Sequence, residues 1–239
     1  MPPCCNGGGS RMCGGMGELK GLADARAWAR EQLQVDPEWS AVAVLPQVLD
    51  AEECAWCHRA AQQCGERLAD VGGGPFAGGG LCDTLSTFSH DVAFSDEHIA
   101  LYLHYDGFLQ RECPALYAKL HAAMTQQSRV PSDPAVPLQL RCAEFHSYAE
   151  GGGLLAPGHR DEGSTLTLSV LLSEPDSFGG GEFVTWRDAL PVAHALRKGD
   201  AVLFHSCRAH NVAQVTRGLR QSLVIELWTG DVNVSDRNG

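Results

Sequence analysis

Apolar residues recur at helical spacing in the first part of the chain. Over residues 18–33 they follow steps of three and four residues, which predicts an amphipathic helix. The segment AVAVLP at 41–46 is typical of a short strand. Asp50 and Glu53 then form the capping box of a second helix. One face of that helix carries small apolar residues, namely Cys54, Cys57, Ala61 and Cys64.

The pattern changes from helical to alternating about halfway along the chain. Residues 96–127 are predicted to be helical, with breaks near Gly107 and Pro114. After the Pro-rich segment at 131–137, short alternating or β-branched segments follow one another: LQLRCAEFHSYA, STLTLSVLLS, GEFVTW, GDAVLFHS, HNVAQV and RQSLVIELW. Helices followed by closely spaced strands with no helix between them predict an α+β fold with an antiparallel sandwich or barrel.

One domain is expected, because 239 residues are enough for one sizeable core and marginal for two. We expect the domain to consist of a flexible tail (1–17), a helical support region (18–137), a core (138–230) and a C-terminal tail (231–239). The glycine cluster at 71–80 is predicted to be a long loop, and we favour a role in covering the substrate.

The charge of the chain excludes several classes of partner. A formal net charge of -11 repels phosphate backbones and anionic lipids, so we expect neither nucleic acid nor a membrane surface as partner. Small molecules or proteins are the expected partners. There is no signal-peptide pattern and no membrane-length apolar run, which predicts a soluble intracellular protein, most simply a cytoplasmic one. The scattered cysteines predict reduced thiols rather than a disulfide scaffold.

The motif His-x-Asp occurs twice and has a different meaning in each place. His104 and Asp106 fall in a predicted helix, where residues two apart point about 200° away from each other and cannot hold one ion. His159 and Asp161 stand at the start of a β segment, where residues i and i+2 share a face. The second pair therefore predicts two ligands of a metal site.

The third ligand is His205 or His210, and the residues that follow favour His210. Arg220 comes ten residues later, with Ser222 two positions further along on the same strand face. A fixed cation and a hydroxyl beside a metal suit a bound carboxylate, which the phenol of Tyr148 can also reach. Two histidines and one carboxylate leave open positions on the ion, as in non-haem Fe(II) oxygenases.

From about Leu138 to Trp228 the chain resembles the iron(II)- and 2-oxoglutarate-dependent dioxygenases, and within them the prolyl 4-hydroxylase type. The resemblance consists of four segments in the family's order: SYAEGGGLLAPGHRD, STLTLSVLLS, FGGGEF and KGDAVLFHSCRAHNVAQVTRGLRQSLVIELW. It implies a double-stranded β-helix, or jelly roll, flanked by the N-terminal helices. Collagen-type members usually carry Lys where Arg220 stands, and His146-Ser147 replaces a common basic-aromatic step.

The resemblance also implies the reaction and the roles of the site residues. It implies hydroxylation of a C–H bond in a peptide, protein or small molecule, with O2 as oxidant, 2-oxoglutarate as co-substrate and L-ascorbate as reductant. Arg220 would pair with the distal carboxylate of 2-oxoglutarate, supported by Tyr148 and Ser222. Fe(II) would be held by the three predicted ligands, His159, Asp161 and His210.

Two other functions are compatible with parts of the sequence. A jelly-roll protein could bind metal and a partner without turnover, although such a protein has no use for a buried Arg220. A redox protein centred on Cys54 and Cys57 lacks the strand-before-helix context that its motif needs. We expect those cysteines to be core residues, as well as His146, His194, His205, Trp186 and Trp228, and we expect Gly179, Gly180 and Gly181 to form a turn.

Overall fold

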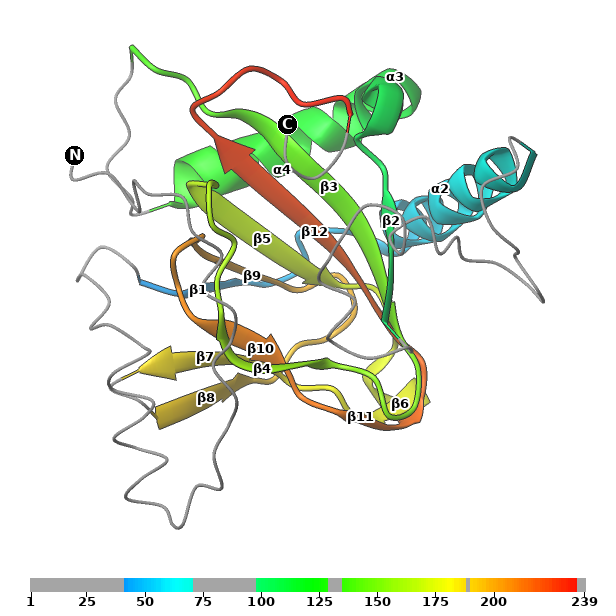
Figure 1. Cartoon of the computed structure of the whole chain (residues 1–239), viewed down its shortest axis with the longest axis vertical. Coiled ribbons are helices and arrows are strands. Elements are labelled where there is room, and N and C mark those ends of the chain that lie inside the picture. Colours follow the sequence, from blue (N-terminus) through cyan, green and yellow to red (C-terminus); the bar gives the residue numbers. More distant parts are fainter. Residues whose placement is uncertain (1–40, 71–97, 129–134, 188–189, 236–239) are drawn as a thin grey trace.

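The computed structural model describes residues 41–70, 98–128, 135–187 and 190–235. The predicted tail at 1–17, the predicted helix at 18–33 and the glycine cluster at 71–80 lie outside the described residues. The described part consists of two facing sheets, with helices packed on the outer face of the larger sheet (Figure 1).

Both sheets are built from antiparallel strand pairs. In spatial order, the larger sheet contains β1 (Ala43–Leu45), β9 (Ala201–His205), β5 (Leu166–Leu171), β12 (Arg220–Trp228), β3 (Gln139–Tyr148) and β2 (His98–Tyr102). The smaller sheet contains β4 (Leu154–His159), β10 (His210–Val212), β7 (Phe183–Arg187) and β8 (Leu190–His194). A separate ribbon pairs β6 (Phe178–Gly180) with β11 (Val215–Gly218).

The helices lie where the sequence has helical periodicity. They are α2 (Ala51–Asp70), α3 (Phe108–Glu112) and α4 (Pro114–Gln127), with short 3-10 turns η3 (Tyr105–Gly107) and η4 (Pro175–Ser177). The predicted capping box is confirmed, because the Asp50 N–H donates to Glu53 Oε2 at 2.8 Å and the Glu53 N–H donates to Asp50 Oδ1 at 2.8 Å. The predicted mixture of helices and antiparallel sheets is therefore confirmed.

Two apolar layers hold the fold together. The first lies between the helices and the larger sheet, where Leu120 and Met124 of α4 belong to one buried cluster with Leu168 and Ile225. The second lies between the two sheets and contains Tyr148, Phe183, Val202, Phe204, Val212 and Val215. Burial of this kind is the main favourable term in folding, so these layers fix the positions of the strand ends.

The cysteines of α2 belong to the first apolar layer, as expected. Cys54 and Cys57 are buried, and burial raises the pKa of both thiols, that of Cys57 far above its usual range. A buried thiol with a raised pKa is a poor nucleophile. The core interpretation of this CxxC pair is therefore the one that the structure supports.

One predicted helical segment is wrong at its start. Residues 98–102 form strand β2, which pairs with β3 along its whole length, instead of the first turn of a helix. The apolar residues of HIALY fit either period, and pairing with β3 decides between them. The predicted breaks are confirmed, since Gly107 has a φ of 61° and Pro114 begins α4.

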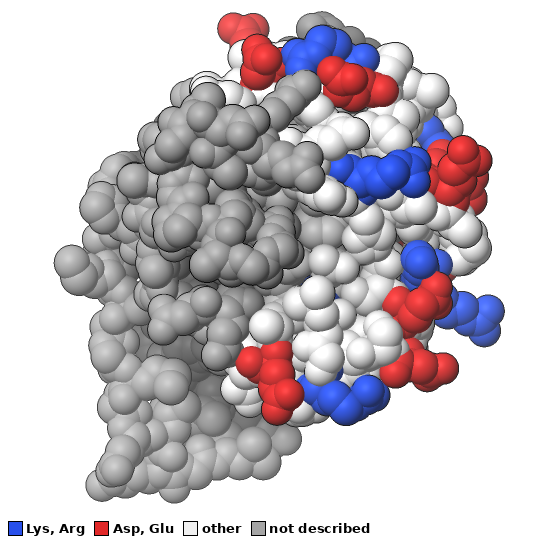
Figure 2. All heavy atoms as spheres, turned by 90° about the vertical axis from the view of Figure 1, so that its right-hand side faces the viewer, with Lys and Arg blue, Asp and Glu red and all other residues white. Residues whose placement is uncertain are grey.

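Two further features of the described residues are the length of the helices and the distribution of surface charge. In the part of the chain that the structure describes, no helix is long and apolar enough to cross a membrane. On the face shown in Figure 2, basic and acidic side chains of the described residues are interspersed. That part of the surface therefore carries no extended field of one sign.

Candidate functional site

The two predicted histidine ligands lie opposite each other on neighbouring strands. His159 ends β4, His210 begins β10, and the two residues are register partners in the smaller sheet. Their ring centroids are 5.1 Å apart, and the two ring planes are nearly perpendicular. The strand pairing therefore brings together two imidazoles that are far apart in the sequence.

Asp161 completes the group from the loop after β4. Its Oδ1 lies 3.1 Å from His159 Nε2 and its Oδ2 lies 3.6 Å from His210 Nε2. Its Oδ2 accepts a hydrogen bond of 2.7 Å from the Thr167 hydroxyl. One ligand atom from each of the three residues lies within 4.8 Å of the others, and Asp161 is buried.

Two further contacts hold these residues in place. His210 Nδ1 donates to the carbonyl of Arg208 at 3.0 Å, since a carbonyl can only accept. Nε2 of His210 is then the nitrogen with the lone pair, and it points toward Asp161. The Asp161 N–H donates to the carbonyl of Ser206 at 3.0 Å, which holds the loop in place. The donor set of two imidazoles and one carboxylate fits a divalent transition metal.

Arg220 forms a buried cationic site. It is 1% exposed and is the largest of the fully buried side chains. Among the described residues no carboxylate pairs with it, and its Nε has no hydrogen-bond partner. Burial lowers the pKa of Arg220, while the nearby Tyr148 acts in the opposite direction. An unpaired buried guanidinium is costly, so this pocket fits an anion.

The other two predicted anion-binding residues surround the same guanidinium. Arg220 Nη1 donates to Ser222 Oγ at 3.2 Å, and the guanidinium lies 5.5 Å from the centre of the Tyr148 ring. Arg220 and Tyr148 are register partners on β12 and β3. The structure therefore brings Arg220, Tyr148 and Ser222 together, as the sequence predicted.

The His-Asp-His group and Arg220 both contact residues of the apolar layer between the sheets. The rings of Phe183 and Phe204 lie 5.6 Å and 4.7 Å from the ring of His210. Both belong to the cluster between the sheets that also contains Tyr148. The aromatic residues next to His210 and the tyrosine next to Arg220 therefore belong to one layer.

Gly181 makes room for Arg220, a role that the sequence alone did not indicate. A Cβ at Gly181 would lie 2.9 Å from Arg220 Cδ, and the φ of Gly181 is 68°. The predicted turn at the three glycines is only partly correct, because Gly179 and Gly180 belong to strand β6, where Gly180 has a positive φ of 67°. The spatial constraint on Gly181 could not be predicted because Arg220 is far away in the sequence.

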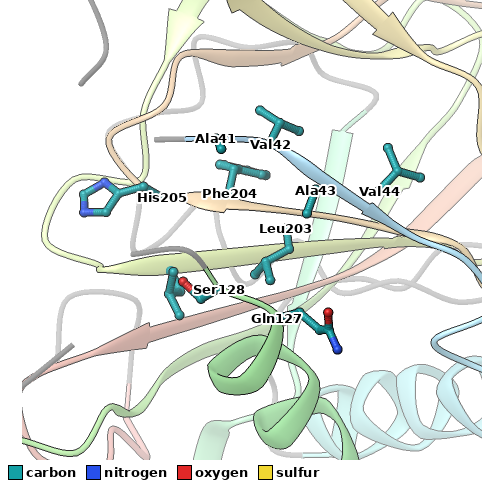
Figure 3. Close-up of a pocket in the computed structure, with 10 residues that line it drawn as sticks. Ala41, Val42, Ala43, Val44, Gln127, Ser128, Leu203, Phe204 and His205 are labelled. Carbon is teal, nitrogen blue, oxygen red and sulfur yellow. The ribbon is translucent and has the colours of Figure 1, made fainter. Parts of the chain in front are cut away.

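His205 is separated from the metal group by strand alternation. Phe204 faces the layer between the sheets, so the next residue, His205, faces the other side of β9. It lines a cavity of about 290 Å³ together with Ala41, Val42, Ala43, Val44, Gln127, Ser128, Leu166, Leu203 and Phe204 (Figure 3). Burial lowers the pKa of His205 to about 4, so it is neutral at pH 7.

The remaining candidates have structural contacts. His104 is buried in the turn before η3 and Asp106 is exposed in η3, so the first His-x-Asp pair does not converge. Trp186 Nε1 donates to Asn211, and Trp228 lies under the guanidinium of Arg141. His194 Nε2 contacts the Thr185 hydroxyl at 2.9 Å, and its pKa is lowered, mainly by burial.

Similarity to known proteins agrees with this geometry. Over 96 residues, the chain is 32% identical to a PKHD-type hydroxylase of Acidovorax ebreus, a match that covers 36% of this chain and 42% of the relative. A crystal structure of an oxidoreductase of the 2OG-Fe(II) oxygenase family from Burkholderia pseudomallei has a TM-score of 0.54 at 15% identity, covering 90% of this chain and 94% of that one.

A second solved structure has a peptide bound. The prolyl hydroxylase from Trichoplax adhaerens, in complex with a peptide fragment of the hypoxia inducible factor oxygen degradation domain, has a TM-score of 0.51 at 15% identity. That alignment covers 87% of this chain and 92% of the neighbour. The predicted resemblance to the iron(II)- and 2-oxoglutarate-dependent dioxygenase superfamily is confirmed.

The sequence similarity to this superfamily covers a small part of the chain, whereas the structural similarity covers most of it. The sequence match spans less than half the length of the curated relative, 42%, and no protein-family model matches the chain. The structural similarity covers most of the chain at low identity, so it shows the fold of the superfamily. The activity therefore has to be argued from the site itself.

Proposed function

We propose that this protein is an Fe(II)- and 2-oxoglutarate-dependent dioxygenase that hydroxylates a C–H bond of a peptide, protein or small molecule. The observation that carries the proposal is Arg220, a buried cation without an anionic partner among the described residues. It lines the same inter-sheet layer as the His-Asp-His group. We infer that the two facing sheets form the double-stranded β-helix of the superfamily.

Each side chain then has a defined task. His159, Asp161 and His210 would hold Fe(II), with the Arg208 carbonyl and the Thr167 hydroxyl orienting two of them. When bound, Fe(II) supplies the activation of O2 that converts 2-oxoglutarate to succinate and CO2 and oxidises the substrate. No protein group is needed as nucleophile, so the chain contributes binding, orientation and the exclusion of water.

Arg220 would bind the distal carboxylate of 2-oxoglutarate. Its guanidinium offers two parallel donors to the two carboxylate oxygens, and Ser222 holds one side of it in place. The ring of Tyr148 lies next to the same guanidinium. Phe183 and Phe204 supply apolar walls next to His210, which would keep water away from the reacting atoms.

The substrate class, the reductant and the location complete the proposal. The Trichoplax prolyl hydroxylase is seen with a peptide, which supports a peptide or protein substrate for this chain, and a small molecule is the second candidate. We propose L-ascorbate as the reductant and the cytoplasm as the location. We also propose that residues 138–230 form the catalytic core and that residues 18–137 support it.

Succinate formation tests the proposed activity. Purified protein should be incubated with Fe(II), ascorbate, O2 and 2-oxoglutarate, together with a panel of proline-rich peptides and small metabolites. We expect succinate to form and at least one substrate to accelerate it. Fe(II) binding without 2-oxoglutarate binding or succinate would instead support the alternative of a non-catalytic metal-binding interaction protein.

His205→Ala is expected to keep most of the succinate-forming activity, within about a factor of two. His205 faces the cavity of Figure 3, away from the layer that contains His210. Steady-state rates of the two single variants, His205→Ala and His210→Ala, would test the assignment. An inactive His205 variant beside an active His210 variant would show that the third ligand is misassigned.

Gly181→Ala is expected to raise the 2-oxoglutarate concentration needed for half-maximal binding severalfold. The added methyl group would lie 2.9 Å from Arg220 Cδ and would push the guanidinium out of position. Gly107→Ala is the matched control, because Gly107 also has a positive φ but its nearest neighbouring atom lies 3.9 Å away. Equal 2-oxoglutarate titration curves for the two variants would contradict the role of Gly181.

A further inference from the structure

Three polar side chains form a continuous chain inside the barrel, along strand β3. The carboxylate of Glu144 lies 2.8 Å from His146 Nε2, and His146 Nδ1 lies 3.2 Å from the Tyr148 hydroxyl. All three residues are buried, Glu144 with an exposure of 1%. The proposed function uses Tyr148, the last of these three residues, and gives no task to Glu144 or His146.

Strand geometry places these groups on the same face as the anion pocket. Residues two apart on a strand share a face, so Glu144, His146 and Tyr148 point to the same side of β3. On the neighbouring strand β12, Ser222 stands opposite His146 and Arg220 stands opposite Tyr148. The chain of contacts therefore ends beside the guanidinium of Arg220.

The contact with Glu144 holds the His146 ring at its Nε2 atom. An ionised Glu144 carboxylate can only accept, so Nε2 of His146 carries a hydrogen and donates to it. The other nitrogen, Nδ1, faces the phenol in either protonation state of the ring. It accepts the phenol hydrogen when it has a lone pair, and it donates to the phenol oxygen when it carries a hydrogen. The ring planes of His146 and Tyr148 are nearly parallel, at 21°.

We propose that His146, held by Glu144, is a positioning residue for the 2-oxoglutarate site. It fixes the phenol oxygen of Tyr148 beside Arg220, and so sets the affinity for the distal carboxylate of the co-substrate. This inference rests on the proposed function. It goes beyond the sequence-based expectation for His146, which gave that residue a place in the core.

The contact makes a specific prediction for substitutions of His146. Loss of one ordinary hydrogen bond corresponds to a change of about fivefold in a dissociation constant. His146→Ala is therefore expected to raise the dissociation constant for 2-oxoglutarate about fivefold, with little change in the rate at saturating co-substrate. The amide of Asn reaches the position of Nδ1 and that of Gln reaches the position of Nε2. His146→Asn should therefore restore most of the affinity and His146→Gln little of it.

A double-mutant cycle separates positioning from general damage to the barrel. If His146 acts through Tyr148, then His146→Ala should have no further effect on 2-oxoglutarate affinity in a Tyr148→Phe background. Affinity is measured by anaerobic titration of 2-oxoglutarate into Fe(II)-loaded protein, and the thermal midpoint of each variant is recorded as well. His58→Gln serves as the control, because His58 is half-buried and contacts the Leu172 carbonyl away from this pocket.

The outcomes distinguish this inference from the proposed function. Suppose that wild-type protein binds 2-oxoglutarate but the effects of His146→Ala and Tyr148→Phe on affinity are strictly additive. That result would overturn the positioning role and leave the proposed function intact. So would a stronger rescue by Gln than by Asn. Wild-type protein that does not bind 2-oxoglutarate would overturn the proposed function and this inference with it.

Discussion

Replacing Asp161 with Ala is expected to abolish Fe(II)-dependent succinate formation and to weaken Fe(II) binding by more than about 100-fold. The loss of an outer contact to a metal ligand already costs about 10- to 100-fold, and Asp161 is a predicted ligand itself. Its two oxygens lie near both His159 and His210, so its removal would leave Fe(II) with two imidazole ligands and no anionic one. His159→Ala and His210→Ala are expected to have the same effect.

Equilibrium dialysis of Fe(II) under anaerobic conditions, followed by the succinate assay, measures both effects. Asp106→Ala is the matched control, because Asp106 belongs to the other His-x-Asp pair and its side chain is 77% exposed in η3. We expect that variant to keep wild-type metal binding and activity. Retention of Fe(II) binding by Asp161→Ala would remove the carboxylate from the proposed site.

Replacing Arg220 with Ala is expected to weaken 2-oxoglutarate binding by about 30-fold or more while Fe(II) binding stays near wild type. A bidentate guanidinium in a partly dry pocket contributes about 2 to 5 kcal/mol when its loss also leaves the ligand charge unpaired. Arg220 lies on β12, away from the strands that carry the two histidines. The two binding equilibria should therefore separate in this variant.

Arg220→Lys should fall between wild type and Arg220→Ala, because Lys keeps the charge but loses the two parallel donors. The metal-to-ligand absorption band of anaerobic Fe(II) protein follows the titration with 2-oxoglutarate. An unchanged curve for Arg220→Ala would end the assignment of the anion pocket. A parallel loss of Fe(II) binding would show that the variant has lost its fold.

Local rules in the sequence pointed to residues that the structure brings close together. Strand alternation suggested that His159 and Asp161 share a side, but His159 ends β4 and Asp161 follows in a loop, where Thr167 and Ser206 hold it. The spacing of Arg220 favoured His210 over His205. The structure gives a separate reason for that choice, since alternation on β9 turns His205 away from the layer that holds Phe204. Two separate arguments thus favour His210 over His205.

The sequence could not predict features that depend on a distant partner. Residues 98–102 have no local property that excludes a helix, and only pairing with β3 makes them a strand. β4 and β8 were missed because Pro157, Gly158 and Pro191 interrupt the strand pattern. The space that Gly181 leaves for Arg220 and the contact between His146 and Tyr148 are likewise visible only in three dimensions.

If His159, Asp161 and His210 hold Fe(II) as proposed, their positions in the fold would couple iron supply to folding. His159 and His210 belong to the smaller sheet, whereas Asp161 is held by Thr167 of β5 and by Ser206, which directly follows β9 in the larger sheet. An ion bound by all three would act as a cross-link between the sheets, in addition to the apolar layer. Since ligands that bind only the native state stabilise it by mass action, iron starvation would lower the folded population of the protein as well as its activity.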